Sequence, residues 1–270
     1  MDHIQRALDK ARQQYGDPMH ALLVETALSD AKSLDPPVRS PANAVRWSAL
    51  PVADIRNAHL AQNRIVTADR SDPAHWAFDR LRTKLLREMR SRNFRSVAIT
   101  SPTAGCGKSV VAMNLAFSLG HMKECRSLAV DLDLGQTRMA DLLGLDEVAA
   151  MEDFLGGRRS VQSSFVRYGL NLAFGANGRR AAYTAELLHS ASTKRALADA
   201  CGELQPDVVI YDLPPMLVGD HVTGFLSHVD CVVLVAAAEA STLAEVDHCE
   251  CELAEKSNLL GVVLNKCRYP

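Results

Sequence analysis

The sequence predicts an α/β fold, with a mostly parallel β-sheet that carries helices on both of its faces. Short apolar runs rich in β-branched residues alternate along the chain with segments whose apolar residues recur at helical spacing. Such alternation is typical of strand–helix–strand units, in which the connecting helices cover the sheet. One run leads into a loop with two glycines and two others end in aspartate, which gathers polar residues at the carboxyl ends of the strands.

The composition is that of an ordinary soluble globular protein. Of the 270 residues, 47% are hydrophobic and 23% are charged, and the formal net charge of −2 gives no overall attraction to nucleic acid or membrane. No stretch approaches the roughly 18 apolar residues of a membrane span, and the N-terminus lacks the apolar region of a signal peptide. We therefore expect a cytoplasmic protein whose seven cysteines are reduced thiols.

The N-terminal part of the chain is expected to differ from the rest. Residues 1–30 are predicted to be a helical N-terminal extension, with helical periodicity over 2–15; this helix packs on its own domain or contacts a partner. Several prolines and the lack of sustained periodicity favour a loosely ordered linker over 31–71. The folded domain is then expected to cover 72–270.

The folded domain is expected to begin with a basic helix at 73–92, with Ser71 or Asp72 as its N-cap. Between Arg80 and Arg95 there are seven basic side chains and one acidic side chain. Such a density is typical of a solvated helix face or of charge neutralised by a neighbouring subunit. Contact with DNA or anionic lipid is the alternative.

The strand expected at 96–100 is followed by Ser-Pro-Thr-Ala-Gly-Cys-Gly-Lys-Ser (101–109) and by a helix at 110–119. A strand, a tight loop and a helix are the context that a nucleotide-phosphate loop requires, although a proline replaces the usual first glycine. In such a loop, backbone N–H groups and the positive end of the helix dipole bind phosphate. The residues expected to bind the nucleotide are Thr103, Ala104, Gly105, Cys106, Gly107, Lys108, Ser109 and Val110.

Two side chains of this loop have separate predicted roles. Lys108 is expected to reach the β- and γ-phosphates of ATP. The hydroxyl of Ser109 is expected to bind Mg²⁺.

Three aspartates complete the predicted site. The strand expected at 126–133 ends in Asp131 and Asp133, which strand alternation places on the same side. Next to a triphosphate such carboxylates bind Mg²⁺ or accept a proton from an attacking hydroxyl, unless they are ordinary polar residues at a strand end. The strand expected at 207–212 ends in Asp212, oriented toward Mg²⁺ through water. The predicted catalytic residues are Lys108, Asp131 and Asp133, and the predicted magnesium ligands are Ser109, Asp131 and Asp212.

The remaining segments continue the alternation. Further strands are expected at 170–174, 229–236 and 259–264, and further helices at 140–145, 151–155, 186–204 and 242–256.

Four stretches together resemble one family: the 101–109 loop, Asp131-x-Asp133, Asp212-x-Pro214-Pro215 and Gly261-Val262-Val263-Leu264-Asn265. The chain looks like a bacterial tyrosine autokinase of capsule and exopolysaccharide biosynthesis, a family within the ParA/MinD-like P-loop ATPases. The resemblance implies ATP and Mg²⁺ as cofactors and phosphoryl transfer to tyrosine. It also implies a homo-oligomer in the nucleotide-bound state and recruitment to the inner face of the plasma membrane by a membrane-embedded chain-length regulator.

The sequence departs from that family at several positions. The kinases of the family end in a cluster of tyrosines, where this chain has Tyr269 alone; the tyrosines at 15, 168, 183 and 211 are expected to be structural. The Glu-x-x-Arg element of ring assembly falls on Trp76 and Asp79, so the usual ring is not implied. Thr103 stands where partition and division-site ATPases carry a signature lysine, which favours the kinase branch.

Two other functions stay open at this point. One is a partition or positioning ATPase that uses its basic 80–95 stretch on DNA or membrane. The other is an adaptor that binds ATP without phosphorylating a protein and regulates a membrane chain-length regulator.

Overall fold

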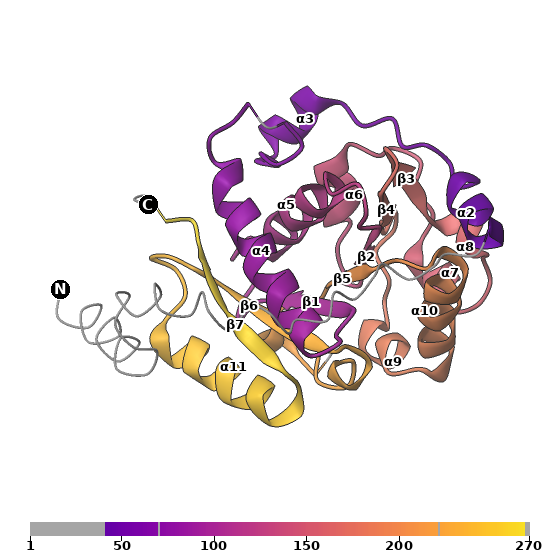
Figure 1. Ribbon diagram of the computed structural model, residues 1–270. Helices are drawn as coiled ribbons and strands as arrows, with labels where there is room; N and C mark the ends of the chain where they lie inside the picture. The colour runs from indigo at the N-terminus through magenta and orange to yellow at the C-terminus, as the bar shows by residue number, and fades with distance from the viewer. Residues whose placement is uncertain (1–40, 70, 221, 268–270) are drawn as a thin grey trace. The chain divides into compact units, whose positions relative to one another are not determined.

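A seven-stranded sheet organises the described part of the chain, which comprises residues 41–69, 71–220 and 222–267 of a computed structural model. The strands lie in the order β3-β4-β2-β5-β1-β6-β7 (Figure 1). Neighbouring strands are parallel, except that β3 pairs antiparallel with β4 at one edge. The strands are β1 (Ser96–Thr100), β2 (Ser127–Asp131), β3 (Val166–Tyr168), β4 (Leu172–Gly175), β5 (Val208–Asp212), β6 (Cys231–Ala237) and β7 (Leu259–Asn265).

Helices cover both faces of this sheet (Figure 1). Helices α3, α4, α5 and α6 pack on one face, and α2, α7, α10 and α11 pack on the other. The α-helices are α2 (Pro41–Ser48), α3 (Asn57–Gln62), α4 (His75–Ser91), α5 (Lys108–Gly120), α6 (Arg138–Leu143), α7 (Met151–Leu155), α8 (Val161–Ser164), α9 (Thr184–Leu188), α10 (Ala191–Leu204) and α11 (Leu243–Lys256). Two short 3₁₀ helices, η2 (Met216–Val218) and η3 (Leu226–His228), lie between β5 and β6.

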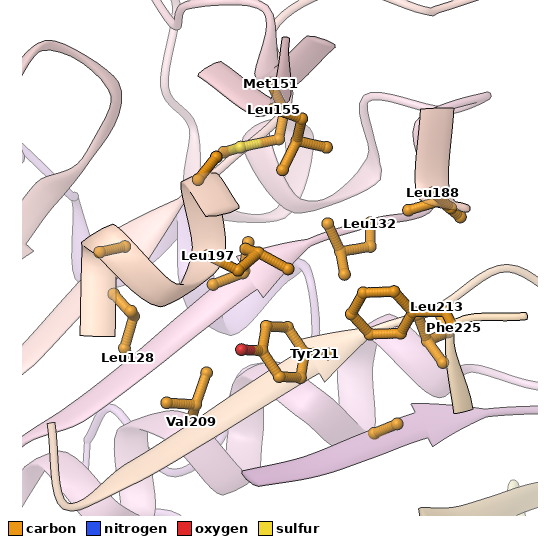
Figure 2. Close-up of a cluster of buried hydrophobic side chains, with 14 of the residues drawn as sticks. Leu128, Leu132, Met151, Leu155, Leu188, Leu197, Val209, Tyr211, Leu213 and Phe225 are labelled. Atoms are coloured by element: carbon orange, nitrogen blue, oxygen red, sulfur yellow. The ribbon is translucent and has the colours of Figure 1, made fainter. Parts of the chain in front are cut away.

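The sheet separates two apolar cores, because successive residues of a strand point to opposite faces. In β5, Val209 and Tyr211 belong to one core, whereas Ile210 belongs to the other. Figure 2 shows the first core, in which the rings of Tyr211 and Phe225 meet edge to face with centroids 5.4 Å apart. The central strands are buried on both faces, so they occur in the sequence as continuous apolar runs from which strands can be predicted.

Most of the expected strands and helices are present, some with shifted ends. The expected strand at 96–100 and the expected helix at 151–155 match β1 and α7. The single helix expected at 186–204 is wrong: α9 and α10 are separate, because the hydroxyl of Ser190 accepts the N–H of Thr193 at 3.1 Å and caps α10. Strand β3 and helix α8 are too short to show a period in the sequence.

The first helix of the expected folded domain, α4, starts two residues later than the expected 73. The carboxylate of Asp72 accepts the N–H of Ala74 at 2.8 Å, so this predicted N-cap binds a turn that precedes the helix.

Residues 41–69 are folded, which differs from the loosely ordered linker expected over 31–71. Trp47 of α2 is 3% exposed, and its indole N–H donates to the carbonyl of Leu170 at 2.9 Å. Leu60 of α3 and Ile65 are buried against α5 and α6. These tertiary contacts order two short helices whose own periodicity is too brief to predict them.

The other N-terminal predictions concern residues outside the described ranges. These predictions are the helical extension at 1–30, with its helix at 2–15, and the start of the linker up to residue 40. None of the helices in the described ranges combines the length and the apolar character that a bilayer span needs.

Candidate functional site

The loop between β1 and α5 has the backbone shape of an anion-binding cradle. Gly105 and Gly107 have φ angles of 84° and 89°, in the left-handed region that side chains disfavour. A Cβ at Gly107 would also overlap the side chain of Asn265, whose amide donates to the carbonyl of Cys106 at 2.9 Å. The end of β7 therefore supports the loop, and glycine at 107 allows that close approach.

Helix α5 begins at Lys108, and its first turn contains no acidic residue. The first N–H groups of a helix have no partner within the helix, and the helix dipole adds positive potential at the same end. A phosphate held by the loop would therefore meet the N-terminus of a 13-residue, largely buried helix.

The predicted aspartates reach the same place from neighbouring strands. Strand β5 lies between β1 and β2, and Asp131 is the register partner of Asp212. Asp133 lies two residues beyond the end of β2. It is therefore not part of the strand, although the sequence predicted that it would be. Its backbone N–H donates to Oδ1 of Asp131 at 3.1 Å, so the chain turns at this point.

Lys108 joins these carboxylates. Its Nζ donates to Oδ2 of Asp133 at 2.7 Å, to Oδ1 of Asp212 at 3.3 Å and to the hydroxyl of Ser109 at 3.3 Å. Burial acts to lower the pKa of Lys108, but the attraction of Asp212 and Asp133 outweighs it and raises that pKa. Lys108 is therefore a cation at neutral pH, although its side chain is only 9% exposed.

Asp131 and Asp212 carry the features expected of ligands to a hard cation. Both are buried, and each Oδ2 has no hydrogen-bond partner among the described residues. Burial is the largest cause that raises the pKa of each carboxyl; for Asp131 the negative charge of Asp212 adds to it, and Lys108 opposes it in both. Buried carboxylate oxygens without partners, beside the hydroxyl of Ser109, fit Mg²⁺ and its water ligands.

A cavity of about 810 Å³, a size that suits a nucleotide, is lined by Lys108, Ser109 and Asp133, whereas Asp131 and Asp212 are not part of its lining. Six of the eight loop residues predicted to bind nucleotide line it: Ala104, Gly105, Gly107, Lys108, Ser109 and Val110. The other two lie elsewhere. Thr103 contacts the Cys106 thiol at 3.7 Å, and that thiol lies 3.4 Å from the hydroxyl of Ser241. Cys106 is 2% exposed, so its role is within the loop structure.

Several residues that line the cavity were not predicted. They are Gln62, Asn63, Arg64, Leu134, Gly135, Gln136, Arg138, Thr184, Pro214, Pro215, Val218 and Lys266. Three of them, Arg64, Arg138 and Lys266, are exposed cations from three separate segments. Arg138 lies near the aspartates in the sequence, but no sequence signal points to Arg64, which falls in the expected linker.

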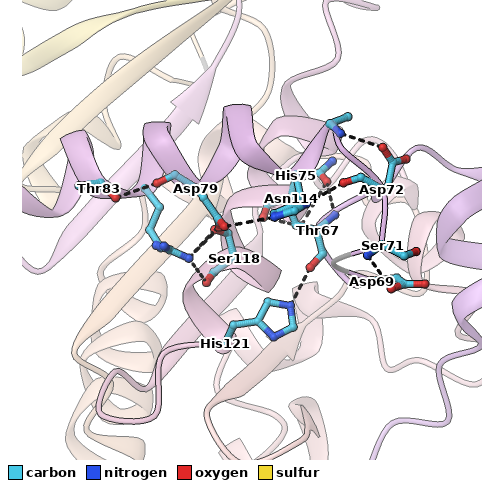
Figure 3. A network of polar contacts seen from close by, with 12 residues as sticks. Thr67, Asp69, Ser71, Asp72, His75, Asp79, Thr83, Asn114, Ser118 and His121 are labelled. Atoms are coloured by element: carbon cyan, nitrogen blue, oxygen red, sulfur yellow. Dashed lines mark hydrogen bonds and ion pairs between the residues drawn. The ribbon is translucent and has the colours of Figure 1, made fainter.

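Arg64 is held at the cavity by α5. Its φ is 62°, and its carbonyl accepts the side-chain amide of Asn114 at 2.9 Å. The carbonyl oxygen of the same Asn114 side chain accepts the N–H groups of Val66 and Thr67 at 2.8 and 3.1 Å. Figure 3 shows Asn114 beside Thr67. The helix that begins with Lys108 thus also fixes the segment that carries Arg64.

A second polar network joins α4 to α5. Arg82 donates to the carboxylate of Asp79 at 2.8 Å and to the carbonyl of Ser118 at 2.9 Å. Figure 3 shows the two acceptor residues, Asp79 and Ser118. The side chain of Arg82 is 16% exposed, so this member of the basic 80–95 stretch contributes to internal structure. In contrast, Trp76, one of the two positions of the expected assembly element, is 66% exposed.

Comparisons with known proteins agree with this geometry. A scan against protein-family models finds no match. EpsB of Ralstonia solanacearum, named as a tyrosine-protein kinase, is 31% identical over 196 residues, which are 72% of this chain and 26% of EpsB. The chain therefore spans about a quarter of that relative. The tyrosine-protein kinase YwqD of Bacillus subtilis is 27% identical over 215 residues, which are 78% of this chain and 88% of YwqD.

Solved structures share the fold. The kinase domain of the Escherichia coli tyrosine kinase ETK superposes with a TM-score of 0.67 at 23% identity, over 76% of this chain and 82% of that domain. The septum site-determining protein MinD of Pyrococcus horikoshii, complexed with Mg-ADP, superposes with a TM-score of 0.50 at 23% identity, over 63% and 69% of the two chains. The chain thus has the P-loop NTPase fold, and its sequence is similar to those of bacterial tyrosine-protein kinases over about three quarters of its length.

Proposed function

We propose that this protein binds Mg·ATP and transfers its γ-phosphoryl group to tyrosine, as a regulator of capsule or exopolysaccharide polymerisation or export. One observation carries the proposal: Lys108 lies between Asp133 and Asp212 at the start of α5, in front of a nucleotide-sized cavity. The similarity to EpsB and YwqD supports the choice of a tyrosine kinase among P-loop proteins.

The loop and Lys108 would bind the phosphates. Backbone N–H groups at Gly105 and Gly107 and the N-terminus of α5 are oriented before ATP arrives, so they need no rearrangement to stabilise negative charge. Lys108 adds a full positive charge that burial leaves poorly screened. Ser109, Asp131 and Asp212 would hold Mg²⁺, which supplies further charge neutralisation at the phosphates.

Asp133 is the best placed base for the attacking hydroxyl. Asp133 lines the cavity, and its side chain is 13% exposed. The side chain of Asp212 is only 1% exposed, and Asp131 is equally buried. A carboxylate that faces the cavity can accept the proton of a tyrosine hydroxyl and hold it in line with the phosphate. Asp131, the other carboxylate predicted to be catalytic, would act mainly as a ligand of Mg²⁺.

The partners are part of the proposal. We infer a membrane-embedded chain-length regulator that recruits this protein to the inner face of the plasma membrane, and a homo-oligomer in the nucleotide-bound state. Similarity to the tyrosine kinases supports both. The exposed Trp76, which stands where the family carries the glutamate of its Glu-x-x-Arg element, offers a different site for such contacts.

A nucleotide switch without protein phosphorylation is the second candidate, favoured by the likeness to MinD. A positioning ATPase of this kind would release phosphate and leave the protein unlabelled. An adaptor that only binds ATP would neither release phosphate nor label the protein.

The test is to incubate the full chain with γ-labelled ATP and Mg²⁺ and to measure protein-bound label and released phosphate in the same samples. The Lys108→Ala variant is compared with Lys256→Ala, in which an exposed lysine paired with Glu252 is removed. We expect label on tyrosine in the wild type and in Lys256→Ala and none in Lys108→Ala. Phosphate release without label would favour the switch, and neither signal with ATP still bound would favour the adaptor.

A further inference from the structure

Tyr183 differs from the other described tyrosines in its exposure. It is 78% exposed, although the sequence favoured a structural role for it. Tyr211 is 4% exposed in the core, and Tyr168 is partly buried, with its ring edge to face against Phe117 at a centroid distance of 5.2 Å. Among the tyrosines in the described ranges, Tyr183 alone presents its side chain freely to solvent.

Tyr183 is also next to the cavity. The following residue, Thr184, lines the cavity together with Lys108 and Asp133. The carbonyl of Tyr183 accepts the N–H of Leu187 at 3.2 Å, which fixes the backbone of Tyr183 at the start of α9. The backbone that carries this exposed phenol is therefore fixed next to a residue of the wall of the proposed ATP site, although Tyr183 itself does not line the cavity.

The segment that carries Tyr183 is attached to two other residues of that wall, Leu134 and Gln136. The N–H of Ala181 donates to the carbonyl of Leu134 at 2.9 Å. The side-chain amide of Asn177 donates to the carbonyls of Leu134 and Gln136 at 3.2 and 2.8 Å. Asn177 is 0% exposed, so the anchor is a buried one, and Leu134 and Gln136 both line the cavity. These bonds keep Tyr183 near the cavity of its own chain.

Two positive charges shortly before Tyr183 in the sequence suit a phosphorylated product. Arg179 and Arg180 precede it in the sequence, and both are exposed. Arg179 lies 3.9 Å from carboxylate oxygens of both Glu152 and Asp153, and Arg180 has no ion pair with any described residue. A tyrosine phosphate adds about 1.5 to 2 negative charges, and nearby arginines stabilise it.

We propose that Tyr183 accepts the γ-phosphoryl group of ATP bound in the cavity of the same chain. The inference rests on the proposed function and names its acceptor. The phenolic oxygen forms a bond to the γ-phosphorus, and the bond from that phosphorus to the β–γ bridging oxygen breaks. ADP leaves with that electron pair, and the phenolic proton passes to the carboxylate of Asp133. Attachment to the cavity wall gives the phenol a high effective concentration, which favours transfer within one chain.

The test maps the label by mass spectrometry of peptides after reaction with γ-labelled ATP and Mg²⁺. Wild type is compared with Lys108→Ala, Tyr183→Phe and the matched control Tyr168→Phe. We expect the phosphate on the peptide that contains Tyr183, with the label lost in Lys108→Ala and Tyr183→Phe and retained in Tyr168→Phe. Mapping in the unsubstituted protein keeps the test valid if Tyr183→Phe fails to fold.

Other outcomes separate the two proposals. Label on Tyr15 or Tyr269 and not on Tyr183, or undiminished label in Tyr183→Phe, would overturn the acceptor and leave the kinase intact. A wild type without label would overturn the kinase and the acceptor together. In a mixture of wild type with Lys108→Ala, we expect no label on the Lys108→Ala chains; label on their Tyr183 would overturn transfer within one chain.

Discussion

The Nζ atom of Lys108 lies 2.7 Å from Oδ2 of Asp133, a carboxylate 25 residues further along the chain. This contact joins the first residue of α5 to the turn that follows β2. Lys108 also lies 3.3 Å from Asp212 at the end of β5, so one buried cation balances a carboxylate from the turn after β2 and a carboxylate from β5.

Removal of the buried cation should destabilise the fold. In Lys108→Ala, Asp131 and Asp212 keep their buried carboxyls without a positive partner, and we expect the free energy of unfolding to fall by about 2 kcal/mol. Urea unfolding followed by circular dichroism measures the change. Lys256→Ala should differ from the wild type by less than about 0.5 kcal/mol, because exposed pairs contribute little. Equal stability of Lys108→Ala and the wild type would mean that the carboxyls are neutral without Lys108.

Arg64 should strengthen ATP binding. It lines the cavity with no ion pair to any described residue, so its charge is available to phosphate. We expect Arg64→Ala to raise the dissociation constant for Mg·ATP by roughly three- to tenfold, the loss of one partly solvated charged contact. Arg56→Ala, which removes an exposed arginine just before α3, is the control and should leave that constant unchanged. An identical effect of the two variants would show that Arg64 acts only through net charge.

Asn114 should be required to hold the segment that carries Arg64. Its side chain binds the backbone of residues 64, 66 and 67, and it is 0% exposed. We expect Asn114→Ala to cost about 2 to 4 kcal/mol, because it leaves several buried backbone groups without partners. Asn114→Ala should accelerate hydrogen exchange at the amides of Val66 and Thr67 more than at the amides of β5. Uniform acceleration across both regions would indicate global destabilisation only.

Thiol reactivity should follow exposure and pKa. Burial raises the pKa of the Cys231 thiol to about 12 and that of Cys249 to about 11, so both stay neutral and unreactive at pH 8. Cys251 and Cys267 are exposed and should be alkylated first. Burial opposes ionisation of Cys106, but hydrogen bonds from Ser241 and Thr103 outweigh it and lower the pKa of this thiol. Cys106 is therefore protected from alkylation because the reagent cannot reach it, and not because its pKa is raised.

The measurement for the thiols is alkylation with iodoacetamide at pH 8, followed by mass spectrometry of peptides over time. While the pH is below the pKa of a thiol, its reactive thiolate fraction rises about tenfold for each unit by which the pH increases. Cys231 and Cys249 should therefore begin to react only in strongly alkaline solution. Alkylation of Cys231 at the rate of Cys251 at pH 8 would contradict the burial of β6.

The sequence was most informative where one signal is local and continuous. The 101–109 loop and its flanking strand and helix could be predicted because glycine, lysine and serine have fixed positions between two apolar segments. Asp131 and Asp212 could be predicted because each ends a buried strand. Asp133 was predicted as a site residue for the wrong reason, since it reaches Lys108 from a turn beyond the strand.

Other parts of the site depend on contacts between distant segments. Arg64 reaches the cavity through Asn114, 50 residues further along the chain, and nothing around Arg64 in the sequence marks that contact. Trp47 likewise orders α2 through the carbonyl of Leu170. Tyr183 could not be distinguished from a structural tyrosine, because its exposure depends on the hydrogen bonds of residues 177–181 to the cavity wall.

The proposed function depends first on the binding of Mg·ATP by Lys108 and the aspartates around it. Isothermal titration calorimetry of the full chain with ATP, with and without Mg²⁺, tests it most directly when the wild type is compared with Lys108→Ala. We predict that the wild type binds ATP more tightly with Mg²⁺ and that Lys108→Ala weakens binding at least about tenfold, as expected for the loss of a charge-assisted contact. ATP binding that is equally tight in Lys108→Ala and indifferent to Mg²⁺ would contradict the account.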